Sequence, residues 1–237
     1  MTAVFVRRLG GALTDLGYLL LAAVPSLRAG YRWWARDRYL HLAPRYATTI
    51  RDDPAYFAPL QALLRTLETE QPTIVAEVGA GTGGATALLA RRYPGALLTA
   101  IDVSPLMLAR LQAGGALRVR RVVGDAFALP LRSATADLVL VHNAPFDVPE
   151  LLRVAAPCGT VAVVLSSGAI LSWWMRRLRP RLAGRSAGWP CIRELRAQGG
   201  IAWIFRRTPV DGASEPGPAT AAGRSRWRRW PSASAGY

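Results

Sequence analysis

The chain has no lysine: all 30 basic residues among its 237 are arginine. Histidine and cysteine are also scarce, with two of each. Two histidines are too few for a His-rich metal centre, so we expect no metal site. Cys158 and Cys191 stand too far apart for a zinc motif and too few for a disulfide framework. This cysteine usage indicates a reducing compartment, and we expect a cytoplasmic protein.

Positive charge exceeds negative charge in this chain, and the excess is concentrated toward the C-terminus. The formal net charge is +15, and residues 171–237 hold 13 arginines against 3 acids, whereas residues 71–170 hold 8 against 6. The uniform use of arginine indicates GC-rich codons rather than thirty separate functional choices. Because 51% of the residues are hydrophobic, general disorder is excluded, and the length allows one α/β domain with a sizeable core.

A long hydrophobic run is also missing. The uncharged stretch Leu16–Leu27 is shorter than the roughly 20 residues that span a bilayer. Arg7 and Arg8 precede it as in a signal peptide, but no small-x-small cleavage site follows. The apolar residues recur at helical spacing, namely Leu9, Leu13, Leu16, Leu20 and Val24. We therefore predict an amphipathic helix.

A glycine-rich turn follows an apolar segment near residue 80. Residues 74–78 have the composition of a buried parallel strand, and Thr82 begins a predicted helix. Gly79, Gly81 and Gly83 allow a sharp turn and a close approach of the backbone to a ligand. Gly79, Gly81 and Gly84 also match the dinucleotide pattern G-x-G-x-x-G. The turn alone therefore predicts an adenosine cofactor without deciding which one.

Three acidic residues narrow the choice. Glu77 precedes the first glycine by two positions, where a carboxylate can bind a cationic group. A second predicted strand, Leu97–Ile101, ends at Asp102, at the spacing of a ribose-binding acid. A third, Val119–Val123, is followed by Gly124 and Asp125, which suit the adenine edge. The Gly-Asp-Ala element is not expected in nicotinamide enzymes.

Two further stretches complete a family pattern. A strand at 137–141 follows Leu129-Pro130-Leu131, and the turn at 151–159 precedes a strand at 160–165. Over residues 70–167 the chain resembles the class I S-adenosylmethionine-dependent methyltransferases, and most closely their ubiquinone/menaquinone-biosynthesis (methyltransferase type 11)-like branch. The resemblance implies an α/β fold with a Rossmann-like, doubly wound, mostly parallel sheet. Beyond strand five we predict a helix at 193–198 and a strand at 201–205, and we find no convincing seventh strand.

The resemblance also implies S-adenosylmethionine as the cofactor and assigns its contacts. Glu77 with the loop residues Gly79, Ala80, Gly81 and Gly83 would hold the methionine half. Asp102 would accept from both ribose hydroxyls, with Val103 against the adenine. Asp125 would accept from the adenine amino group and the Ala126 N–H would meet the ring, while Asn143 completes the set of expected cofactor contacts.

The acceptor should approach over the carboxyl ends of strands four and five, at residues 142–147. His142 is the candidate catalytic base for a phenol or enol carbon, although a structural hydrogen bond or a contact with the cofactor is the favoured interpretation. Asn143-Ala144-Pro145-Phe146 resembles the Asn-Pro-Pro-Tyr motif of amine-directed methyltransferases. The surrounding stretches follow the small-molecule branch. We therefore expect a small-molecule acceptor, with an amine-directed RNA or protein methyltransferase, or an inactive cofactor-binding scaffold, as alternatives.

We predict four parts: a helical extension (1–40), a helical lid (41–70), the cofactor domain (71–207) and a disordered basic tail (208–237). Residues 31–39 alternate aromatic and cationic side chains. They suit either an anionic membrane surface or a helix packing Trp33 and Trp34 onto the core. The first alternative favours a lipid- or quinone-like acceptor and peripheral contact with the inner face of a membrane, with nucleic acid a less favoured partner. We expect Tyr46 and Tyr56 in the lid, and cofactor affinity largely independent of residues 1–40. A second basic, Trp-rich stretch covers Leu171–Arg181.

Overall fold

The computed structural model describes residues 13–51 with gaps at 15, 19, 22 and 23, then 54–114, 118–166 and 191–206. The basic stretch Leu171–Arg181 and the tail from residue 208 lie outside the described residues. Within these ranges, no helix is both long and apolar enough to cross a membrane.

A seven-stranded sheet forms the centre of the protein, in the order β3-β2-β1-β4-β5-β7-β6. Its strands are β1 Ile74–Val78, β2 Leu97–Asp102, β3 Val119–Val123, β4 Ala136–His142, β5 Ala155–Leu165, β6 Cys191–Ala197 and β7 Gly200–Arg206. The first five run parallel, and β7 runs antiparallel to β5 and β6. The predicted doubly wound, mostly parallel α/β sheet is confirmed. The strand order reverses between β1 and β4, which places a ligand crevice at their carboxyl ends.

The prediction for the last elements was wrong in one place. Residues 193–198 were predicted as a helix, but β6 pairs with β7 and supplies the seventh strand. Gln198 and Gly199 both have left-handed backbones, with φ of 52° and 84°, as a two-residue hairpin turn requires. Arginine and glutamate favour helices locally, but tertiary pairing at the sheet edge prevails here. Across the hairpin, Trp203 Nε1 donates to Glu194 Oε2 at 3.2 Å.

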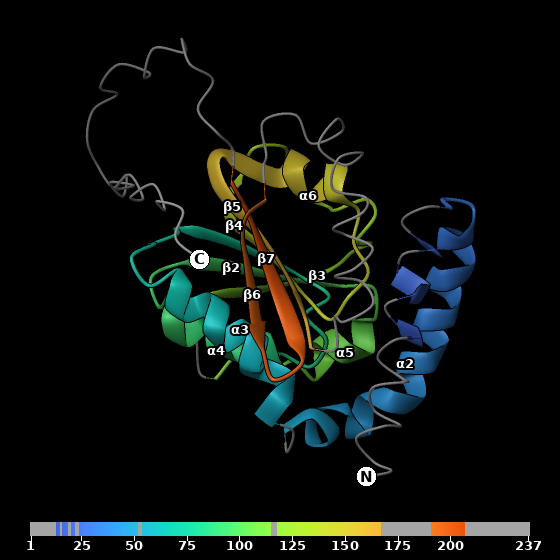
Figure 1. The fold of residues 1–237 in the computed structure, drawn as a ribbon. Helices are drawn as coiled ribbons and strands as arrows, with labels where there is room; N and C mark the ends of the chain where they lie inside the picture. The colour runs from blue at the N-terminus through green and yellow to red at the C-terminus, as the bar shows by residue number, and fades with distance from the viewer. Residues whose placement is uncertain are drawn as a thin grey trace.

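Helices flank the sheet: α2 Leu27–Arg51, α3 Pro54–Thr66, α4 Gly84–Arg92, α5 Pro105–Ala109 and α6 Val148–Val154. The long α2 lies beside α5 at the side of the molecule, drawn in blue (Figure 1). α3 packs on the antiparallel strands β6 and β7. Residue 40, where we divided extension from lid, falls inside α2, so both predicted parts share one helix.

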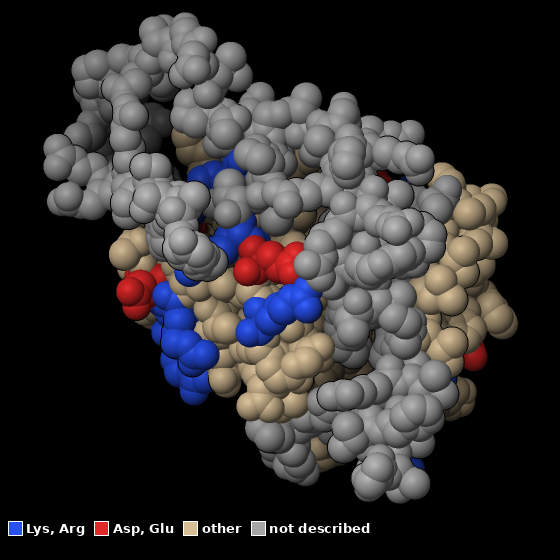
Figure 2. Space-filling view, in the orientation of Figure 1, with Lys and Arg blue, Asp and Glu red and all other residues tan. Residues whose placement is uncertain are grey.

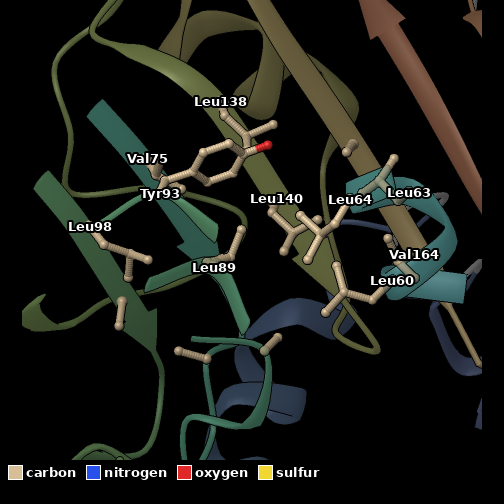
Figure 3. Packing of buried hydrophobic residues seen from close by; sticks show 14 of the residues in the cluster. Leu60, Leu63, Leu64, Val75, Leu89, Tyr93, Leu98, Leu138, Leu140 and Val164 are labelled. Carbon is tan, nitrogen blue, oxygen red and sulfur yellow. The ribbon is translucent and has the colours of Figure 1, made fainter. Parts of the chain in front are cut away.

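Two hydrophobic clusters cover the two faces of the sheet. In the first, leucines of α3 and Leu89 of α4 pack on Val75, Leu98 and Leu140 (Figure 3). In the second, Leu151 and other apolar residues around α6 pack on the opposite face. Strands that are apolar on both faces are what a covered parallel sheet requires. The two clusters hold the strands in place, so that the carboxyl ends of β1 to β4 form a fixed edge. The polar side chains of the candidate site lie at this edge.

Candidate active site

Three carboxylates lie at the carboxyl ends of three adjacent strands. Glu77 belongs to β1, Asp102 ends β2, and Asp125 follows β3. Because β1, β2 and β3 are neighbours, the three acids lie in this order along one edge of the sheet. All three line a single pocket, together with the glycine turn from Gly79 to Thr82.

The glycine turn is held by hydrogen bonds to the next strand. The N–H groups of Gly79 and Ala80 donate to the Ile101 carbonyl at 2.8 and 3.0 Å. A Cβ on Gly79 would lie 2.1 Å from the Ala144 Cβ, and φ at Gly79 is +76°. Gly83, with φ of +92°, caps α4, and a Cβ there would meet the Gln112 backbone at 2.7 Å. Both the close packing and the left-handed backbone conformation therefore require glycine at these two positions.

Gly79→Ala should destabilise the protein more than Gly81→Ala, by about 1–3 kcal/mol, because the added methyl overlaps Ala144. Gly81 is the matched control. Its φ is also left-handed, at +55°, but the nearest atom to a Cβ there is Tyr46 Cε1, at an ordinary 3.8 Å. Urea unfolding of both variants measures the difference. Equal destabilisation would mean that backbone strain, not the contact with Ala144, decides the residue.

Glu77 is a buried carboxyl group with one hydroxyl partner. Its side chain is 1% exposed, and the Thr86 hydroxyl donates to Oε2 at 2.6 Å. The pKa of Glu77 is raised to about 8, chiefly by burial; the bond from Thr86 opposes this shift, and the charge of Asp102 adds to it. A buried carboxylate of this kind is stabilised by a bound cation.

Asp102 organises the turn around it. Oδ2 accepts from the Gly81 N–H and Oδ1 from the Ser104 N–H, both at 2.8 Å. Burial raises the pKa of Asp102, and these backbone bonds act against the shift. A carboxylate has about four lone-pair positions, so both oxygens can still accept one bond from a ligand in the pocket.

Two arginines of α2 contact residues that were predicted to bind the adenine ring. Arg32 Nη1 lies 2.7 Å from Asp125 Oδ2, and Arg36 Nε donates to the Val103 carbonyl at 3.3 Å. The other oxygen of Asp125 accepts from the Phe127 N–H at 3.0 Å. The extension is therefore tied to the cofactor domain through two residues that the resemblance assigns to adenine binding.

His142 and Asn143 connect the ends of β4 and β5 to α3. His142 Nε2 lies 3.3 Å from the Tyr56 carbonyl oxygen, and the ring packs edge-on against Tyr56. Burial lowers the pKa of His142 to about 4, so the ring is neutral near pH 7. Asn143 Oδ1 accepts from the Ser166 N–H at 2.7 Å, and its Nδ2 donates to the Ser166 hydroxyl at 2.7 Å. These contacts fit the structural interpretation of His142, and its catalytic role stays a prediction.

An aromatic wall closes the pocket. Tyr31, Tyr39 and Tyr46 of α2 and Tyr56 of α3 all line it. Tyr46 and Tyr56 were predicted for the lid. Tyr31 and Tyr39 were not predicted, because cofactor affinity was expected to be largely independent of residues 1–40. A signal was present, because positions 31, 39 and 46 are spaced by eight and seven residues, each close to two helical turns, and so lie on one side of a helix.

The structure brings the sequence-predicted site residues together, with one exception. The pocket is lined by Glu77, Gly79, Ala80, Gly81, Asp102, Val103, Asp125, Ala126, His142 and Asn143. Gly83 lies outside this lining and supports the turn instead. Phe146, which the amine-directed alternative needs as a stacking platform, is 7% exposed and belongs to the core cluster around α6.

Comparison with known proteins gives a consistent result. Residues 75–168 match the family model described as a methyltransferase domain. Trans-aconitate 2-methyltransferase of Escherichia coli O1:K1 is 33% identical over 135 residues, covering 55% of this chain and 50% of the relative. Malonyl-[acyl-carrier protein] O-methyltransferase of Halorhodospira halophila is 40% identical over 99 residues, covering 38% of this chain and 34% of the relative. The chain thus spans about half the length of the curated relatives it matches, or less.

A solved structure agrees in fold. The Burkholderia thailandensis 1,6-didemethyltoxoflavin-N1-methyltransferase, with bound 1,6-didemethyltoxoflavin and S-adenosylhomocysteine, superposes with a TM-score of 0.56 at 18% identity. The match covers 77% of this chain and 91% of that one. Sheet order, glycine turn and family match agree, whereas placement in the ubiquinone-like branch stays a prediction. Residues 75–168 thus match a methyltransferase domain, and the described α/β unit has the fold of the class I S-adenosylmethionine-dependent methyltransferases.

Proposed function

We propose that this chain transfers a methyl group from S-adenosylmethionine to a small-molecule acceptor that is lipid- or quinone-like. The observation that carries the proposal is the row of Glu77, Asp102 and Asp125 along one pocket. A cation, a ribose diol and an aminopurine, joined in that order, match three acids on consecutive strands. The relatives named above act on trans-aconitate and on malonyl-[acyl-carrier protein], which supports an acceptor other than nucleic acid.

The residues fit this cofactor in detail. Glu77 is a buried acid for which the ligand supplies a cation, and only Tyr46 comes within 4 Å of the space above Gly81. S-adenosylmethionine supplies an already activated methyl group when bound. The protein then needs to hold the acceptor in line and exclude water, and such positioning lowers barriers by about 7–11 kcal/mol. The aromatic wall is placed to exclude water from the pocket.

Transfer of a labelled methyl group into fractionated lipid, RNA and protein extracts tests the proposal. Label in the lipid fraction, lost in an Asp102→Ala variant, is the expected result. Label in RNA or protein would favour the amine-directed alternative. Binding of S-adenosylmethionine without transfer to any fraction would favour the inactive scaffold.

Two observations support the lipid- or quinone-like acceptor over the amine-directed alternative. Both ends of the Asn143 amide are engaged by Ser166, and Phe146 is in the core rather than at the pocket. On the face shown in Figure 2, acidic side chains stand next to basic ones. On β6, Arg196 Nη2 lies 2.9 Å from Glu194 Oε1. A broad basic field for nucleic acid is not seen among the described residues of that face.

The N-terminal helices carry exposed apolar residues beside arginines. Trp33 is 73% exposed, so it does not pack on the core as one of our alternatives held. The other exposed apolar side chains of these helices are Leu13, Leu16, Leu20, Val24, Leu27 and Trp34. An exposed arginine near an anionic bilayer contributes about 1 kcal/mol. We propose that this surface rests on an anionic membrane.

Trp33→Ser combined with Leu16→Ser should reduce flotation with phosphatidylglycerol-containing vesicles severalfold, since both side chains are exposed and would insert into the interface. Neither residue lines the cofactor pocket, so affinity for S-adenosylmethionine should not change. Val123→Ser, a change of an exposed apolar residue on β3, is the control. Vesicle binding equal to that of the unmodified protein would refute the membrane contact.

A further inference from the structure

A second cavity lies behind the aromatic wall, and we call it the chamber. Its volume is about 780 Å³, within the range of small-molecule sites. Helix residues 13–46 form most of it, and Tyr56, Asn143 and Ser166 complete its lining. The chamber shares five residues with the cofactor pocket, namely Tyr31, Tyr39, Tyr46, Tyr56 and Asn143. These five residues therefore border both spaces.

The lining is mostly apolar, and several of its polar groups are already engaged. Leucines at 13, 20, 21, 27 and 42 and the Trp34 ring supply apolar surface. The Tyr18 hydroxyl donates to the Asn143 carbonyl at 2.8 Å, and the Tyr46 and Tyr56 hydroxyls are 3.2 Å apart and bond to each other. Arg38, the charged residue of the lining, stacks over Trp34 with 5.3 Å between Cζ and the ring centroid. Such a surface favours a hydrocarbon over a polar metabolite.

We propose that the chamber holds the apolar tail of the methyl acceptor, with the reacting end at the tyrosines shared with the cofactor pocket. This rests on the proposed function, and it specifies the acceptor as a molecule with a long alkyl or isoprenoid-type chain. An acceptor must reach the methyl group from the side of residues 142–147, and Asn143 lies in both linings. The tail then extends away from the cofactor between the N-terminal helices.

Gly17 offers a way to fill the chamber without disturbing its walls. It lines the chamber, it is helical, and no atom of the described residues lies within 4 Å of a Cβ placed there. Gly17→Phe therefore reduces the space available to a tail. Gly30 is the matched control, because it is also helical with open space around its Cβ but does not line the chamber.

The probes are 4-alkylphenols with propyl, nonyl and pentadecyl chains, titrated in the presence of saturating S-adenosylhomocysteine. Each buried methylene should tighten binding to the unmodified protein by about fourfold until the chamber is full. In Gly17→Phe the propyl compound should bind as before, while the pentadecyl compound should lose at least tenfold in affinity. Gly30→Phe should leave the whole series unchanged.

The outcomes separate this inference from the proposed function. If S-adenosylhomocysteine binds but affinity does not depend on chain length, the tail site is wrong and the methyltransferase proposal stands. If both glycine variants weaken the pentadecyl compound equally, the effect is not specific to the chamber and the inference also fails. If S-adenosylhomocysteine itself does not bind the unmodified protein, the proposed function fails first.

Discussion

Asp102→Asn should reduce the affinity for S-adenosylmethionine by about a hundredfold or more. In the resemblance this carboxylate accepts from both ribose hydroxyls, and a hydrogen bond to a charged group contributes about 1.5–3 kcal/mol. The structure adds a second cost. Both oxygens accept backbone N–H bonds, from Gly81 and Ser104, so either orientation of an amide turns its NH₂ group toward one of these donors. One buried N–H then loses its partner, and the glycine turn loses its support.

Isothermal titration with S-adenosylmethionine measures this loss, and Asp137→Asn is the matched control. Asp137 Oδ2 likewise accepts backbone N–H bonds, from Thr73 and Ile74, but it lies at the opposite ends of the strands. Because both bonds go to one oxygen, the amide oxygen of the control variant can still accept them, and this variant should keep its cofactor affinity. Retention of affinity within a few-fold in Asp102→Asn would contradict the assigned role.

Glu77→Gln should flatten the dependence of stability on pH while weakening cofactor binding. The pKa of Glu77 is raised from 4.5 to about 8 in the folded protein. Between these values the unfolded chain is ionised and the folded chain keeps its proton, so the folded state binds more protons. The free energy of unfolding therefore falls as pH rises across this window, by about 1.4 kcal/mol per pH unit from this group. The summed loss is of the order of a few kcal/mol.

Urea unfolding of Glu77→Gln and the unmodified protein at several pH values tests the slope. The difference between their free energies should change steadily from about pH 5 to pH 8 and level off above the folded pKa. Glutamine can still accept the bond from Thr86, so the variant remains suited to the buried position. Parallel curves would show that Glu77 is ionised in the folded protein throughout.

The same carboxyl group predicts proton release on cofactor binding. A cation beside Glu77 lowers its pKa, so at pH 7 binding of S-adenosylmethionine should expel up to one proton and tighten as pH rises toward 8. Titration calorimetry in buffers of different ionisation enthalpy counts that proton. Glu77→Gln should bind more weakly and show no such release.

Much of the cofactor side could be predicted from the sequence because its signals are local. The strands that hold Glu77 and Asp102 are short and mostly apolar, and the strand before Asp125 is a short valine-rich run; Gly or an acid stands at the end of each. Parallel strands bring their carboxyl ends to one edge, so a linear order of acids becomes a site. The seventh strand could not be predicted in this way, since β6 is charged and gains its structure from pairing with β7.

The part of the pocket proposed for the acceptor could not be predicted from the sequence, because it depends on where α2 packs. The amphipathic pattern of the N-terminal segment indicates an apolar face but not its partner. In the structure, Tyr31 and Tyr39 lie against the cofactor pocket, and Trp33 on the same helix is exposed. With α2 beside α5, Tyr31 and Tyr39 line the same pocket as Asp102.

The shared tyrosine wall has a thermodynamic consequence. Tyr31, Tyr39, Tyr46 and Tyr56 border both compartments, and Arg32 fastens the same helix to Asp125. A ligand that shifts these side chains in one compartment alters the free energy of filling the other. Linkage makes that effect reciprocal: whatever factor the cofactor applies to the affinity of the chamber, a chamber ligand applies to the cofactor. If the chamber holds the acceptor as proposed, α2 makes donor and acceptor binding a single coupled equilibrium.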